Sequence, residues 1–197
     1  MGYLFGKASA KITGTRLNLA LVFTVSILPD FDLFFPSFLI HRGPTHSLFF
    51  SFLVLFPFFI VYRKKAIPYF GVLLSHSLIG DIYGDIGAGV QLFWPFSNDL
   101  VSVFTLSNDS VISIGFELLL FTISTIIMFF NKDLKKMFSH DISRIYWLVP
   151  FGSVLGPLFV GVFDPLHIFP FLLVLPSLFY LALFSLLIIG FNSKKCS

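Results

Sequence analysis

Charged side chains and cysteine are both scarce in this chain. Only 12% of its 197 residues are charged, whereas 56% are hydrophobic. A soluble domain carries about 25% charged residues, so the composition excludes an ordinary soluble domain and favours a membrane-embedded protein. The net charge is only +3 and the basic residues stand in short clusters, which leaves no basic surface for nucleic acid. The sequence therefore predicts the lipid bilayer as a partner and no nucleic-acid partner.

The chain has one cysteine, Cys196. A single cysteine excludes a disulfide within the chain and a zinc site built from thiolates. A metal ion would have to be held by imidazole nitrogens and carboxylate oxygens. Histidine and aspartate are therefore the residue types that decide whether the chain has a metal site.

Apolar runs predict an all-α fold, a polytopic membrane bundle of about six transmembrane helices. The helices are expected over residues 17–28, 47–62, 67–80, 111–130, 146–163 and 169–189. The last three runs are long enough for a hydrocarbon core of about 30 Å, whereas the first three are short. We expect one membrane-embedded domain over residues 1–197. Its motif-bearing half covers about residues 17–97, and its C-terminal spans cover about 111–190.

Basic residues alternate from one connection to the next. They precede the first apolar run and follow the second, fourth and sixth, whereas the other connections hold almost none beyond Arg42. Basic residues are retained on the cytoplasmic side of a membrane. The pattern therefore predicts a multi-pass protein of the cell membrane with both termini in the cytoplasm.

Polar residues gather where the first three apolar runs meet the opposite, non-cytoplasmic side. They stand in three segments: PDFD at 29–32, HRGPTHS at 41–47 and SHSLIGD at 75–81. Ionisable groups at membrane depth are costly unless they are paired, solvated or bound to metal. The predicted metal ligands are Asp30, Asp32, His41, His46, His76 and Asp81. Because helices of about 12 to 16 residues rise only about 18 to 24 Å, these groups are expected at headgroup depth or deeper.

Local sequence indicates how two of the histidines are presented. Pro44 or Thr45 is expected to start the second helix, so that His46 lies in its first turn, where the helix dipole favours neutral imidazole. His76 and Asp81 are five residues apart, which is about 140° around a regular helix. They would meet only if the helix unwinds or bulges near Gly80.

Other acidic residues and histidines compete for roles in this site. We favour Asp81 over Asp85 as the partner of His76. Asp164 and His167, in the turn before the last run, are further candidates.

The three polar segments, followed by GVQLFWP at 89–95, resemble the YdjM-like membrane proteins over about residues 21–97. That family is described as LexA-binding, inner-membrane-associated, metal-dependent hydrolases. It is distantly similar to zinc-dependent phospholipase C and P1 nuclease. The resemblance implies a helical protein that uses histidine and aspartate around zinc to cleave phosphodiesters, and it carries over to the six predicted ligands. The chain departs from the family in having no histidine before His41.

The leading hypothesis is a metal-dependent hydrolase with its site at the non-cytoplasmic interface, acting on a phosphoester or phospholipid. Zinc is the first choice, and manganese or magnesium are alternatives. Asp30 or Asp32 would bind metal or act as general base, and Arg42 would hold the substrate anion. A transporter or ion-binding protein would use the same cluster but would line a path to both sides. A non-catalytic membrane scaffold would hold no metal.

Overall fold

The computed structural model describes residues 1–35, 38–84, 89–102, 111–139, 145–163 and 171–190. Within these ranges the regular structure is helical, apart from a single antiparallel bridge between Val90 and Val101. The prediction of an all-α fold is therefore confirmed. The chain divides into two compact units, Met1–Ser113 and Ile114–Ser197. The single domain over 1–197 stays a prediction.

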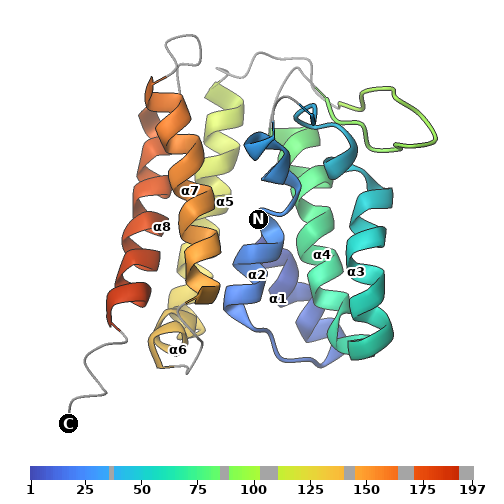
Figure 1. Ribbon diagram of the computed structural model, residues 1–197. Helices are drawn as coiled ribbons and strands as arrows, with labels where there is room; N and C mark the ends of the chain where they lie inside the picture. The colour runs from blue at the N-terminus through green and yellow to red at the C-terminus, as the bar shows by residue number, and fades with distance from the viewer. Residues whose placement is uncertain (36–37, 85–88, 103–110, 140–144, 164–170, 191–197) are drawn as a thin grey trace. The chain divides into compact units, whose positions relative to one another are not determined.

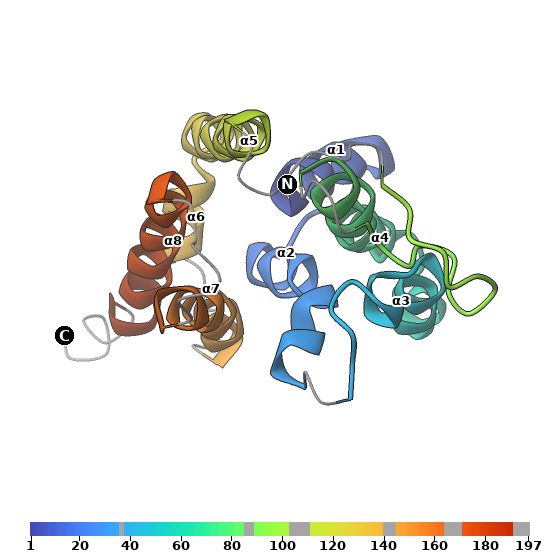
Figure 2. The same cartoon turned by 90° about the horizontal axis from the view of Figure 1, so that it is seen from above.

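Unit 1 contains helices α1 (Gly2–Thr13), α2 (Leu19–Ser26), α3 (Leu48–Tyr62) and α4 (Ile67–Ser75) (Figures 1 and 2). Helix α1 packs closely against α4, and glycine makes the approach possible. A Cβ atom on Gly71 would lie 2.5 Å from Ser9 Oγ. The apolar runs did not predict α1, because Lys7 and Lys11 interrupt its sequence. Its apolar face repeats every three to four residues and is buried, as Tyr3 and Ala10 show.

Helices α2 and α3 begin at side-chain caps, close to the predicted boundaries. Asn18 Oδ1 accepts a hydrogen bond from Leu21 N at 3.2 Å, and Ser47 Oγ accepts one from Phe50 N at 3.0 Å. Such caps satisfy backbone donors that have no partner inside the helix. The run predicted over 67–80 forms α4 and then a π-helix, η4 (His76–Gly84), so the helix changes its winding at the second residue of the polar segment 75–81.

Unit 2 holds most of α5 (Val111–Phe130) together with α6 (Asp133–Ser139), α7 (Ile145–Phe163) and α8 (Phe171–Gly190). Helices α7 and α8 pack through the stacked rings of Trp147 and Phe184, whose centroids are 5.8 Å apart. The predicted runs agree with α5, α7 and α8 to within about two residues. The short α6 was not predicted, because it is polar.

None of the helices in the described ranges has both the length and the apolar character that a membrane crossing requires. The prediction of about six transmembrane helices is therefore not confirmed.

Candidate metal centre

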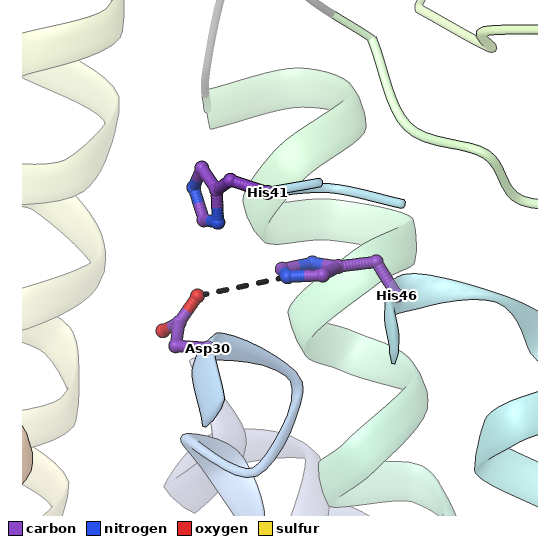
Figure 3. Close-up of side chains that lie close together, drawn as sticks. All are labelled: Asp30, His41 and His46. Carbon is purple, nitrogen blue, oxygen red and sulfur yellow. Dashed lines mark ion pairs between the residues drawn. The ribbon is translucent and has the colours of Figure 1, made fainter. Parts of the chain in front are cut away.

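All six predicted ligands lie together at one end of unit 1. Asp30 and Asp32 come from η1 (Pro29–Phe34), His46 from η2 (Pro44–His46), and His76 and Asp81 from η4. The ring centroid of His46 is 5.3 Å from that of His41 and 5.3 Å from that of His76. Figure 3 shows Asp30, His41 and His46 converging on one point. The fold thus brings the segment at 75–81 to the two polar segments at 29–32 and 41–47.

His46 is completely buried and its ring is oriented by Asp81. His46 Nδ1 lies 2.7 Å from Asp81 Oδ2, so the Nδ1–H group donates a hydrogen bond to this carboxylate. The other nitrogen, Nε2, lies 3.3 Å from Asp32 Oδ2 and 3.8 Å from Asp30 Oδ1. His46 Nε2 has no hydrogen-bond partner within the described residues.

A backbone carbonyl orients the ring of His76, as Asp81 orients that of His46. Its Nδ1 donates a hydrogen bond of 2.7 Å to the carbonyl oxygen of Ser26, the last residue of α2. Its Nε2 lies 3.2 Å from Asp30 Oδ1 and also has no hydrogen-bond partner in the part of the chain that is described. Both Nε2 atoms therefore face the carboxylate of Asp30. No sequence signal could have identified Ser26, because its contribution is a main-chain carbonyl.

The π-helix η4 explains how His76 and Asp81 share the cluster. In a π-helix the backbone bonds join residues five apart, so five residues complete roughly one turn. His76 Nε2 lies 3.8 Å from Asp81 Oδ1 as a result. The predicted bulge is present, and it begins at His76, four residues before Gly80.

Asp32 holds the histidine loop, residues 41–46, in place. Its Oδ2 accepts hydrogen bonds from Thr45 Oγ1 at 2.9 Å and from Arg42 N at 3.2 Å, and its Oδ1 lies 3.1 Å from His41 Nδ1. Burial raises the pKa of this carboxyl group, but contacts with His41, His46 and Thr45 outweigh it and hold the pKa below its ordinary value. Asp32 is therefore an ionised carboxylate whose two oxygens are both engaged by the loop.

The backbone at Arg42 is in the left-handed region, with φ 62°. This conformation is unfavourable for a side chain larger than glycine and persists only where the surroundings enforce it. Here the Arg42 N–H is bonded to Asp32, and the Arg42 carbonyl accepts a hydrogen bond of 2.9 Å from Gln91 N.

Gln91 belongs to residues 89–101, which we call the finger. Val90 and Leu92 anchor its base in a small apolar cluster with Ile82 of η4. Leu92 O also accepts a hydrogen bond of 3.0 Å from Leu48 N at the start of α3. The finger therefore supports the histidine loop, a role that the sequence pattern did not indicate.

Negative charge dominates the cluster. Three carboxylates, those of Asp30, Asp32 and Asp81, surround His46. Burial lowers the pKa of His46, but contacts with Asp32 and Asp81 and the charge of Asp30 outweigh it and raise the pKa to about 9. Positive charge is therefore favoured at this point, whether it is carried by a proton or by a divalent cation.

The distances between donor atoms suit a metal ion. Zinc bonds of about 2.0 to 2.1 Å in tetrahedral geometry separate neighbouring donors by about 3.3 Å. The Nε2 atoms of His46 and His76 lie 3.2 to 3.8 Å from carboxylate oxygens of Asp30 and Asp32. Two overlapping groups, Asp30, His41 and His46, and His46, His76 and Asp81, each have donor atoms that all lie within 4.8 Å of one another. The donor set thus fits a divalent metal such as zinc.

One local expectation about His46 was wrong. His46 does not lie in the first turn of the second helix but in the separate turn η2, and α3 begins two residues later at Leu48. Ser47 caps α3 instead, so the helix cannot begin at Pro44 or Thr45. Asp85, Asp164 and His167 lie outside the described residues.

The fold and the cluster together define a class, an all-helical protein with a buried histidine–aspartate cluster that has the donor set of a metal site. The chain belongs to the YdjM inner membrane protein family, whose profile matches residues 1–139. The match includes every residue of the cluster. The family description indicates a membrane location. No curated protein and no solved structure matches the chain.

Proposed function

We propose that the chain is a membrane-embedded, metal-dependent hydrolase. His46 Nε2, His76 Nε2 and Asp30 would hold the metal, with zinc as the first choice and manganese or magnesium as alternatives. One observation carries the proposal. Two imidazole nitrogens buried in the protein face the same carboxylate oxygen and have no hydrogen-bond partner within the described residues. Buried polar atoms are nearly always satisfied, and a metal ion held between these nitrogens and the Asp30 carboxylate would satisfy both.

The groups around these three residues have the arrangement of a second coordination sphere. Metal-binding histidines almost always donate their other N–H to a carboxylate or a backbone carbonyl. Asp81 accepts from His46, and the Ser26 carbonyl accepts from His76. Asp81 is therefore better suited to orienting His46 than to binding the metal itself. His41, bonded to Asp32, remains a candidate fourth ligand.

The chemistry follows from which groups are accessible. A bound divalent ion would lower the pKa of a water molecule and polarise a phosphoryl group. Of the two aspartates predicted as general base, Asp30 is the accessible one, with 32% of its side chain exposed against 0% for Asp32. Arg42, which is buried near Asp30, Asp32 and Asp81, has the planar, bidentate donor group that suits a phosphate oxyanion. The substrate class is therefore an anionic phosphoester.

Embedding in the membrane is supported by α3 as well as by the family. This helix exposes a series of large apolar side chains: Phe49, Phe52, Leu53, Phe56, Phe58, Phe59, Ile60, Val61 and Tyr62. An apolar surface of this kind is stable against lipid rather than water. The exposed Arg63, Lys64 and Lys65 follow at the end away from the cluster, which agrees with a cytoplasmic position for that end (Figure 1).

The test is metal analysis of the purified full-length protein beside His46→Ala and His76→Ala variants. The control is Asp99→Asn, which removes the charge of an exposed aspartate that is hydrogen-bonded to Ser97. We expect about one divalent ion per wild-type or control chain and loss of the metal from both histidine variants. Hydrolysis of bis(p-nitrophenyl) phosphate should disappear with chelator and return with zinc. A wild-type protein that binds metal but hydrolyses nothing would favour the ion-binding alternative. A wild-type protein that binds no metal would favour the non-catalytic membrane scaffold.

A further inference from the structure

Exposed apolar side chains flank the histidine–aspartate cluster on the segments that carry it. In η1 the carboxylates of Asp30 and Asp32 lie on the inner side, whereas Phe31 and Leu33 between and after them are exposed. Phe38 and Ile40, just before His41, are 87% and 73% exposed. A single stretch of chain therefore presents ligand side chains inward and bulky apolar side chains outward.

The finger lies at the same end of unit 1 as η1 (Figure 1), and it carries a second group of exposed apolar side chains. Phe96 is 88% exposed, and Phe93 and Leu100 are more than half exposed. The finger is bonded to the histidine loop through Gln91 N and Arg42 O, so the two groups flank the same loop. We call Phe31, Leu33, Phe35, Phe38, Ile40, Phe93, Phe96 and Leu100 the apolar rim.

The composition and position of the apolar rim indicate what covers it. Residues 31–40 contain one charged residue, Asp32, whose side chain is buried, and residues 92–100 contain one, the exposed Asp99 between Phe96 and Leu100. A protein partner would leave polar groups at the edge of such a patch, whereas acyl chains require none. The ring of Phe49 at the start of α3 lies 6.0 Å from that of Trp94 and 6.4 Å from that of Phe96. The rim is thus continuous with the apolar surface of α3.

We propose that the apolar rim inserts among phospholipid acyl chains and that the substrate is a membrane amphiphile whose anionic headgroup enters the cluster from the lipid side. The accessible groups of the cluster, His41 at 41% side-chain exposure and Asp30 at 32%, are the ones that meet the headgroup first. The identity of the substrate rests on the proposed hydrolase function, whereas the insertion of the rim does not.

Spin labels measure the insertion directly in the full-length protein. In a Cys196→Ser background, which has no cysteine, single Phe38→Cys, Phe96→Cys and Asn98→Cys variants are labelled and reconstituted into phosphatidylcholine–phosphatidylglycerol vesicles. Asn98 is the matched control because it is an exposed polar residue on the same finger. We expect labels at 38 and 96 to collide more with oxygen, which concentrates among acyl chains, than with a water-soluble nickel chelate. The label at 98 should collide more often with the nickel chelate than with oxygen.

Either of two results would overturn the insertion. Labels at 38 and 96 that collide with the nickel chelate as often as the label at 98 would place the rim in water. Labels shielded from both reagents would show that protein covers the rim. Metal content is measured on the same samples, so that loss of the metal and loss of membrane insertion are detected independently.

The substrate class is tested with a Phe38→Asp, Phe96→Asp double variant that retains its metal. We expect unchanged hydrolysis of the soluble bis(p-nitrophenyl) phosphate and a loss of about tenfold or more on phosphatidylglycerol in vesicles, since each phenylalanine loses its apolar burial. Equal losses on both probes would overturn the assignment, as would a wild type that cleaves only the soluble probe. If wild type cleaves neither probe while the labels lie in lipid, the hydrolase proposal fails and the insertion stands.

Discussion

Replacing Asp81 by asparagine separates an orienting role from a ligand role. The Asp81 carboxylate accepts a hydrogen bond of 2.7 Å from His46 Nδ1, and this contact fixes which nitrogen of His46 faces Asp30. Asparagine keeps the size and one acceptor oxygen but removes the charge that makes His46 a strong donor. Loss of such a second-sphere group weakens metal binding by about 10- to 100-fold. This range corresponds to about 1.4 to 2.7 kcal/mol.

The measurement is a competition titration of the metal-free, purified protein with zinc and a chromophoric chelator. Asp81→Asn should show the intermediate weakening, Asp30→Asn should lose nearly all binding, and Asp99→Asn should bind as wild type does. Equal loss in the Asp81 and Asp30 variants would show that Asp81 is a ligand. An Asp81→Asn affinity equal to that of wild type would refute the orienting role.

Three further predictions concern the loop, the cluster charge and Arg42. Thr45→Val removes the 2.9 Å hydrogen bond to Asp32 and should lower the free energy of unfolding by about 1.5 to 3 kcal/mol. Thr45→Ser keeps the hydroxyl donor and should unfold with the wild-type free energy. Denaturation of both variants in detergent measures the difference. Because the pKa of His46 is raised to about 9 in the fold, its stabilising contribution to the metal-free protein is complete below pH 6.5 and is lost as the pH rises through about 9. Zinc affinity should rise over that interval as the proton leaves, and a melting temperature or zinc affinity that stays flat from pH 6.5 to 9 would contradict both statements. Arg42→Gly should keep the metal, because glycine adopts φ 62° without strain, but should raise KM for a phosphodiester about 10- to 100-fold; an unchanged KM would exclude contact with the substrate.

Much of the helical pattern could be predicted from the sequence because apolar runs and helix boundaries are local properties. The runs over 47–62 and 111–130 correspond closely to α3 and α5. Helices α1 and α6 escaped prediction because their stability comes from packing or polar contacts. Tyr3 of α1 is buried against its neighbours, and Lys136 of α6 pairs with the buried Asp133 at 2.8 Å.

The sequence also predicted which residues belong to the cluster, but it did not predict the role of each residue within it. Ionisable residues are rare in such an apolar chain, so Asp30, His46 and His76 stood out by type alone. Which nitrogen of each ring faces Asp30 depends on the partner of the other nitrogen. For His76 that partner is the Ser26 carbonyl, 50 residues away in sequence, and no side-chain pattern records it.

The sequence by itself determined the helical class, the scarcity of charge and the residue types available for a metal, since these follow from composition and short-range periodicity. The tertiary structure alone decided that η4 winds as a π-helix, that Asp32 fastens the histidine loop, and that the finger supports Arg42. The physical reason is that hydrogen bonds between distant segments depend on distances of a few tenths of an ångström. Such distances are fixed only when the helices of unit 1 pack together.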